Sequence, residues 1–184
     1  MVKVVIVNGM PECGKTTAQE ICRDTLKLIN WNCVIKSSVE WVKEIAAFAG
    51  WDGTKNDKNR KFLSDLKAVL TSWDDAVLNH LINEVDYYHY TGDNYVIFID
   101  IREPYEIEKA KEVFNAATLI VRRPQVECNQ YNNDSDMGVF NFKYDYTIWN
   151  DRGIEGLTAE CVAFLKKIID DENNVYKSEE SYNA

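Results

Sequence analysis

The segment VKVVIVNGMPECGKT (Val2–Thr16) decides the fold of this 184-residue chain. It begins with a run of β-branched residues around one lysine, which is typical of a strand buried on both faces of a sheet. Residues 9–16 match the pattern G-x-x-x-x-G-K-[S/T] at every fixed position, and apolar residues then recur at helical spacing through Ile29. A strand, this pattern and a helix in that order predict a phosphate-binding loop.

The residue types of this loop suit the phosphates of a nucleotide. Glycines let the backbone bend so that successive N–H groups point inward, and the helix N-terminus adds positive potential. We expect Lys15 to reach the β- and γ-phosphates and Thr16 to join the shell of a Mg²⁺ ion. The residues expected to hold the triphosphate are Gly9, Met10, Pro11, Glu12, Cys13, Gly14, Lys15, Thr16 and Thr17.

The rest of the chain alternates strand and helix patterns. Strands are expected at residues 33–35, 95–100, 118–121 and 144–149. Helices are expected at 39–49, with Ser38 as N-cap and Gly50 as its stop, at 104–114, and from about 154–158 past 169. An apolar face running from Phe62 to Val85 predicts one long helix, or two with a break near 72–75. This order favours an α/β fold with a five-stranded parallel sheet, in a single domain at 1–173 followed by a polar tail at 174–184.

Ligands of such folds lie beyond the carboxyl ends of the strands. Asp100 ends an apolar strand there, so we expect it to hold Mg²⁺ directly or through water, next to the phosphate-binding loop. Arginines suit phosphates because the guanidinium group grips two oxygens at once, and Arg102, Arg122 and Arg123 all follow predicted strands.

Composition excludes several other functions. The chain has 21 Lys+Arg against 30 Asp+Glu, a net charge of −9, which argues against binding a nucleic-acid polymer. No apolar run is long enough for a membrane span, and the N-terminus lacks a signal-peptide pattern. Five scattered cysteines favour reduced thiols, so we expect a cytoplasmic protein with small-molecule partners, either monomer or homodimer.

Four segments together resemble the nucleoside monophosphate kinase group of P-loop kinases. They are GMPECGKT, FIDIREP, IVRRP before a polar stretch, and YDYTIWNDRG before the last helix, and they cover nearly the whole chain. The look is closest to phage-type deoxynucleoside monophosphate kinases. The resemblance implies the fold of the P-loop nucleoside triphosphate hydrolases, with strand order 2-3-1-4-5 and helices on both faces. It also implies an acceptor region at about 37–90, a lid at about 123–142, and ATP and Mg²⁺ as cofactors.

The resemblance also implies roles for matching positions. Arg102 would hold the acceptor phosphate, Arg122 and Arg123 would reach the transferring phosphoryl group, and Lys15 completes the catalytic set. The donor base would be cradled by backbone contacts of Asn150, Asp151 and Gly153. From the residues themselves, the acceptor candidates are Lys36, Ser37, Trp41, Arg60 and Arg102, with core packing as the alternative for Trp41 and a solvated helix start for Arg60.

One feature departs from the pattern of many adenylate kinases, whose lids carry arginines. Here residues 125–138 contain none, and they include Glu127, Asp134 and Asp136. The expected function is Mg²⁺- and ATP-dependent phosphorylation of a nucleoside or deoxynucleoside monophosphate. Two alternatives remain open at this point. One is a kinase of another small metabolite, with Glu40 as a base for a hydroxyl acceptor. The other is a non-catalytic nucleotide-binding module.

Overall fold

The protein is an α/β sandwich built on a five-stranded parallel sheet. The computed structural model describes residues 1–54, 56–127 and 138–180, and side chains as far as residue 170. The strands are β1 (Val2–Asn8), β2 (Asn32–Ser37), β3 (Tyr95–Asp100), β4 (Ala117–Arg122) and β5 (Tyr146–Trp149). The helices are α1 (Lys15–Lys27), α2 (Glu40–Phe48), α3 (Asp57–Asp74), α4 (Ala76–His89), α5 (Pro104–Phe114), α6 (Pro124–Glu127), the 3-10 turn η1 (Gly138–Asn141) and α8 (Gly153–Glu180).

The sheet has the order β2-β3-β1-β4-β5 with all strands parallel, as predicted. β1 therefore lies at the centre, and the apolar run that suggested burial on both faces is buried from Val4 onward. The register aligns Val7 and Ser37 with Asp100 on β3, and Asn8 with Ile120 on β4. The residues that follow β1, β2, β3 and β4 consequently meet at one edge of the sheet.

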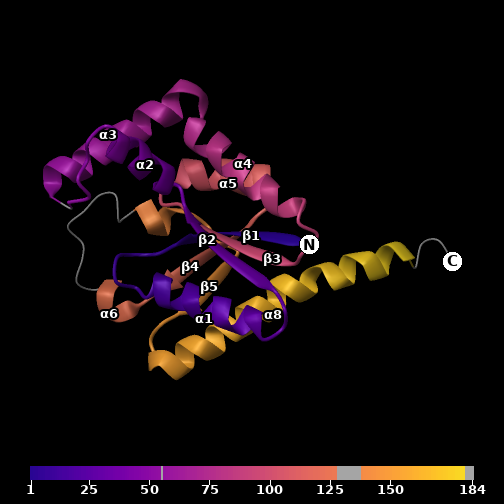
Figure 1. Cartoon of the computed structure of the whole chain (residues 1–184). Coiled ribbons are helices and arrows are strands. Elements are labelled where there is room, and N and C mark those ends of the chain that lie inside the picture. The colour runs from indigo at the N-terminus through magenta and orange to yellow at the C-terminus, as the bar shows by residue number, and fades with distance from the viewer. Residues whose placement is uncertain (55, 128–137, 181–184) are drawn as a thin grey trace.

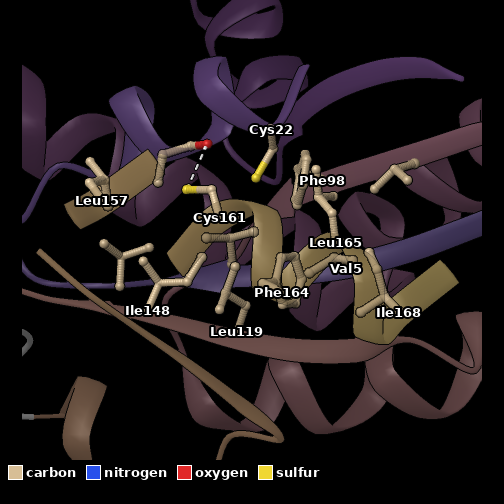
Figure 2. Packing of buried hydrophobic residues seen from close by; sticks show 14 of the residues in the cluster. Val5, Cys22, Phe98, Leu119, Ile148, Leu157, Cys161, Phe164, Leu165 and Ile168 are labelled. Carbon is tan, nitrogen blue, oxygen red and sulfur yellow. Dashed lines mark hydrogen bonds between the residues drawn. The ribbon is translucent and has the colours of Figure 1, made fainter. Parts of the chain in front are cut away.

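Helices cover both faces of the sheet, as Figure 1 shows, and a hydrophobic layer lies between the sheet and the helices on each face. On one face, α1 and α8 pack around Cys22, Phe98 and Cys161. Figure 2 shows this layer from close by, with the Cys161 Sγ directed at the carbonyl of Ala18, 3.6 Å away. On the other face, α4 and α5 pack around Ile97, Ile99 and Ile101. The helices of this second layer carry the region expected to bind the acceptor.

The long apolar segment forms two helices rather than one. α3 ends at Asp74 and α4 begins at Ala76, because Asp75 between them is left-handed, with φ of 46°. The break also corrects the expectation of a single buried face. Val69 is 62% exposed and Trp73 is 78% exposed, whereas Val77 and Leu81 on α4 are buried. A one-residue turn redirects the helix axis, so the apolar positions before and after it face different surroundings.

Three local predictions are wrong in detail. Ser38 does not cap a helix: it is buried, Val39 occupies the N-cap position of α2, and the Ser38 N–H donates to the carbonyl of Asp100. β5 begins at Tyr146, two residues later than expected. α8 continues to Glu180, so most of the segment expected as a tail is helical. The stop of α2 at Gly50, with φ of 95°, is as expected.

Candidate functional site: a phosphate-binding loop at the carboxyl edge of the sheet

The loop between β1 and α1 is held in a conformation that depends on two glycines. Gly9 has φ of 156°, and a Cβ there would lie 2.7 Å from both the Cys13 Sγ and the carbonyl oxygen of Val121. Gly14 has φ of 93°, and a Cβ there would lie 2.4 Å from the Nδ2 of Asn150. Both positions therefore exclude a side chain for reasons of backbone angle and of space. Glu12 also adopts a positive φ of 62°, and the loop curls tightly enough for the Cys13 N–H to donate to the Met10 carbonyl at 3.2 Å.

Helix α1 starts directly after this loop and has no side-chain cap. Its N-cap residue is Gly14, and its first turn carries no acidic residue. α3 provides the contrast, because the Asn56 side chain there accepts a hydrogen bond from the Asn59 N–H at 2.8 Å. The first N–H groups of a helix have no partner within it, and the helix dipole makes their surroundings positive. The start of α1 thus offers backbone donors and positive potential to an anion.

Lys15 and Asp100 face each other across this edge. The Lys15 Nζ lies 3.1 Å from the Asp100 Oδ2, and the other carboxylate oxygen of Asp100 accepts from the Gln19 Nε2 at 2.8 Å. Gln19 lies one turn after Lys15 on α1 and is buried. Sequence reasoning missed it, because a glutamine on an amphipathic helix has no distinguishing pattern. Together these groups put one cation and one oriented carboxylate beside the loop.

The protein side chains here are too few to hold a magnesium ion alone, so phosphate oxygens of a bound nucleotide would have to complete its coordination. Within the described residues, no group of three or more His, Cys, Asp or Glu side chains lies close enough to hold a metal. Mg²⁺ typically keeps several waters and takes one or two carboxylates plus phosphate oxygens. Asp100 and the exposed Thr16, in the first turn of α1, supply a carboxylate and a hydroxyl of the right type. The residues thus fit a Mg²⁺ ion that arrives with a nucleotide.

The loop after β5 is joined to the phosphate-binding loop through Asn150. Its Nδ2 donates to the Cys13 carbonyl at 2.9 Å, and its backbone N–H donates to the Arg122 carbonyl at 2.8 Å. Asp151 and Gly153 follow on the same connection, and Gly153 has φ of 71° at the start of α8. The segment expected to cradle the donor base is therefore adjacent to the phosphate-binding loop, and the Asn150 side chain is engaged in holding that loop.

The two arginines after β4 have different surroundings. Arg122 makes a two-point contact with Glu127 of α6, at 3.1 Å (Nε–Oε1) and 2.6 Å (Nη2–Oε2). Its guanidinium also lies 4.9 Å from the ring centre of Phe140 and 4.8 Å from that of Trp149. The Glu127 contact raises the pKa of Arg122 above its ordinary value. Arg122 is thus already neutralised by a carboxylate of its own chain.

Arg123 instead reaches the phosphate-binding loop. Its Nη1 donates to the carbonyl of Glu12 at 3.4 Å, and the side chain is exposed. η1 and α6 lie at the two ends of the predicted lid. Residues 128–137 between them, with Asp134 and Asp136, lie outside the described residues.

The acceptor candidates are not gathered into one cluster. Lys36 is ion-paired with Glu84 of α4 at 2.6 Å, and this contact raises the Lys36 pKa although partial burial opposes the shift. Trp41 is stacked on His80, with ring centres 4.7 Å apart. Arg60 is exposed in the first turn of α3.

Two further candidates lie at the carboxyl ends of β2 and β3. The Ser37 Oγ accepts from the Val39 N–H at 3.4 Å. Arg102 is exposed directly after β3, and its carbonyl accepts from the Asn8 side chain at 3.1 Å. Ser37 is aligned with Asp100 and Arg102 follows Asp100 by two residues, so both candidates lie at the carboxyl edge of the sheet.

A groove of about 720 Å³ runs between α3 and α5. The nearly buried Lys67 lies in it, 2.6 Å from carboxylate oxygens of both Glu103 and Glu106. Lys67 lowers the Glu103 pKa overall against the raising effect of burial, whereas burial raises the Glu106 pKa. The buried Thr71 Oγ1 has no hydrogen-bond partner among the described residues. The groove begins one residue after Arg102, and sequence reasoning missed it because Lys67 resembles any other lysine of α3.

The expectations about the cysteines and about membrane spans can be compared with the structure over the described residues. Cys13, Cys22, Cys33 and Cys161 are free thiols, as expected, and Cys128 lies outside the described residues. Among the described helices, none combines the length and apolar character that crossing a membrane requires.

Comparison with solved structures identifies the fold. An APS kinase of Mycobacterium tuberculosis matches with a TM-score of 0.50 and 12% identity, over 89% of this chain and 96% of the other. A thymidylate kinase of Ehrlichia chaffeensis has a TM-score of 0.50 and 12% identity, over 90% and 97%. A dephospho-CoA kinase of Campylobacter jejuni has a TM-score of 0.50 and 16% identity, over 91% and 97%.

Searches against family models and curated proteins found no match. The loop, the sheet order and these structures agree, and the chain has the fold of the P-loop kinases.

Proposed function

We propose that this chain transfers the terminal phosphoryl group of ATP to a nucleoside or deoxynucleoside monophosphate. The observation that carries phosphoryl transfer is the pairing of Lys15 with Asp100 at the uncapped start of α1. One cation, one oriented carboxylate and the positive end of a helix suit a triphosphate and its metal ion. The P-loop kinase fold supports the same reaction class.

The chemistry requires positioning and charge neutralisation rather than covalent help. An oxygen of the acceptor phosphate bonds to the γ-phosphorus of ATP while the bond to the β,γ-bridging oxygen breaks, and ADP leaves. Lys15 stabilises the charge on the phosphates, and backbone N–H groups of the loop orient them. Thr16 and Asp100 would hold Mg²⁺, which when bound neutralises charge on the phosphate oxygens. Arg123, whose Nη1 contacts the loop at the Glu12 carbonyl, would approach the transferring group.

A phosphate-bearing acceptor is favoured by the chemistry of the acceptor side. A phosphate oxygen needs no base, whereas a hydroxyl acceptor must lose a proton. Glu40, the candidate base, is exposed in the first turn of α2, and no contact joins it to Lys15 or Asp100 among the described residues. Arg102 follows β3 at the ligand edge, and the adjoining groove between α3 and α5 has room for a base and sugar. The sequence resemblance to monophosphate kinases points the same way.

A different small acceptor is the second candidate. The similar structures include kinases named for thymidylate, dephospho-CoA and APS, so this fold accommodates acceptors of different chemistry. Of the lysines that line the groove, Lys67 is paired with Glu103 and Glu106 and Lys109 with Asp75, which leaves the groove without an excess of positive charge. That observation favours an acceptor whose uncharged part, rather than its phosphate, occupies the groove.

The test is turnover with a panel of acceptors. Purified protein with ATP and Mg²⁺ is incubated with each nucleoside and deoxynucleoside monophosphate, and with shikimate and dephospho-CoA as members of other classes. We expect ADP and a nucleoside diphosphate with at least one monophosphate. ADP formation that depends on none of the monophosphates would refute the proposed substrate class.

Arg102→Ala tests the acceptor assignment. We expect the acceptor KM to rise about tenfold or more, with the ATP KM nearly unchanged, because a charge-assisted contact to the acceptor phosphate is lost. Arg23→Ala, which removes an exposed arginine of α1, is the control. Equal changes in both KM values for Arg102→Ala would contradict its role.

A further inference from the structure

Asn8 is a buried amide at the junction of three functional segments. It is the last residue of β1, and it has no exposed surface. Val4 to Val7 before it are apolar and buried, so another β-branched residue would continue the pattern at this depth. A buried amide is costly unless its polar atoms are satisfied. The contacts of Asn8 therefore need explaining.

Both ends of this amide are used, and each bond reaches a different segment. The Oδ1 accepts from the N–H of Gly9, the first residue of the phosphate-binding loop, at 2.8 Å. The Nδ2 donates to the carbonyl of Arg102 at 3.1 Å and to the Tyr144 Oη at 2.8 Å. The Tyr144 hydroxyl in turn donates to the carbonyl of Val139 in η1 at 3.0 Å. These bonds run from the loop to the acceptor arginine and to the end of the predicted lid.

We propose that Asn8 is a positioning residue that holds the phosphate-binding loop, the backbone of Arg102 and, through Tyr144, the η1 end of the lid in one fixed arrangement. This inference rests on the proposed function, because it assigns donor, acceptor and lid roles to the three segments. It adds a specific consequence. A shift at η1 is transmitted through three hydrogen bonds, those of Tyr144 to Val139, Asn8 to Tyr144 and Gly9 to Asn8, to the first N–H of the loop.

Two variants separate the bond of Asn8 to Tyr144 from its bond to the Arg102 carbonyl. Tyr144→Phe removes the hydroxyl and leaves the bonds from Asn8 to Gly9 and Arg102. We expect the ATP KM to rise several-fold with an unchanged acceptor KM. Asn8→Asp keeps the acceptor oxygen and replaces the amide donor with an oxygen that faces the Arg102 carbonyl. We expect it to raise both KM values. In a cycle built on Asn8→Ala and Tyr144→Phe, the effects on ATP affinity should not add.

A matched control removes a buried hydrogen bond that is not at the ligand edge. Thr118 has no exposed surface, and its Oγ1 bonds to the Asp145 Oδ2 at 2.8 Å near the start of β4. Thr118→Val should lower the melting temperature to a similar degree and leave both KM values unchanged. If Asn8→Asp and Tyr144→Phe behave like Thr118→Val, Asn8 is merely structural and the inference is overturned.

Binding measurements distinguish this failure from failure of the proposed function. ATP binding is followed by calorimetry on the wild type, Lys15→Ala, Asn8→Asp and Tyr144→Phe, and backbone hydrogen exchange is followed in the absence of nucleotide. We expect Tyr144→Phe to speed exchange at residues 9–14 as well as at 138–141. Binding that depends on Lys15, together with unchanged exchange at 9–14, overturns the inference and leaves the function standing. No ATP binding by the wild type overturns both.

Discussion

The proposed donor edge and the proposed acceptor region of this protein are held together by different kinds of interaction. At the donor edge, the amides of Asn8 and Asn150 fix the loop through bonds to backbone groups, and Gln19 orients Asp100. In the acceptor region, Lys36 and Lys67 are paired with carboxylates. Lys15 is itself paired with Asp100, but the groups that fix the loop are neutral amides, which do not compete with an anionic ligand, whereas the carboxylates paired with Lys36 and Lys67 do. For the proposed function, the difference means a donor site that is largely preformed and an acceptor site whose cations must change partners to bind an anion.

The largest expected effect comes from removing the one lysine of the phosphate-binding loop. Lys15→Ala should lower kcat/KM by about 10³-fold, since a preorganised group facing developing charge is worth about 4 kcal/mol. The melting temperature should change little. Lys27→Ala, at the exposed end of the same helix, is the control and should be silent. Activity of Lys15→Ala within tenfold of wild type would remove the loop from the mechanism.

The next effect tests the acceptor region through stability. Lys67→Ala leaves two carboxylates close together with no cation, and we expect it to lower the free energy of unfolding by about 3 kcal/mol, measured in urea. Lys109→Ala breaks a more exposed pair with Asp75, at 2.7 Å, and should cost less than about 1 kcal/mol. Similar losses for the two variants would show that the buried pairs do not hold α3 on α5.

A smaller effect tests how far the donor loop is preformed. Gly14→Ala places a Cβ against the Asn150 Nδ2 at a positive φ, and should weaken ATP binding by about 1–2 kcal/mol in calorimetry. Gly50→Ala is the matched control, because its φ of 95° is similar and nothing lies within 4 Å. Adding Asn150→Ala removes the close contact and should recover part of the loss. Equal ATP affinity in Gly14→Ala and wild type would count against a rigid loop.

The smallest effect tests a second ion pair at the donor edge, that of Arg122 with Glu127. Glu127→Gln releases Arg122, and we expect ATP affinity to rise a few-fold, about 1 kcal/mol, because the arginine no longer has a competing carboxylate. The gain should shrink at high salt. Glu160 of α8 makes a comparable pair with Arg152, at 2.7 Å, and Glu160→Gln should leave ATP affinity unchanged. Weaker ATP binding in Glu127→Gln would mean that the pair orders the site.

The donor edge was the more predictable of the two regions. A strand buried on both faces leaves a continuous apolar run, so β3 was predicted with its observed bounds and the sheet followed from the alternation of elements. The glycines of the loop are fixed by backbone angle, a local property that sequence reveals. Asn8 had a signal of its own, as the polar end of an apolar strand, but its partners Arg102 and Tyr144 are far away in sequence.

The side-chain partners of the acceptor region had no such signal. Lys67 and the solvent-exposed Lys61 both lie on α3, and only packing against α5 makes one buried and the other not. The acid content of the lid segment was visible, but the pairing of Glu127 with Arg122 depends on a short helix that folds back on β4. Similarly, the direction of α3 depends on the left-handed residue Asp75, which the pattern of apolar residues does not reveal.

Because α3 is joined to α4 through the single left-handed residue Asp75, a small change in the backbone angles of Asp75 would rotate the whole of α3. The helix has 18 residues, so its far end lies about 27 Å from Asp75 at 1.5 Å per residue. A rotation of about 10° at Asp75 therefore moves Asp57 by about 5 Å and Arg60 by about 4 Å, roughly the size of a phosphate group. The Lys109 Nζ of α5 forms an ion pair with the Asp75 carboxylate at 2.7 Å. In the proposed acceptor role, the reach of Arg60 would depend on this ion pair at the opposite end of its helix and on the Lys67 pairs with Glu103 and Glu106.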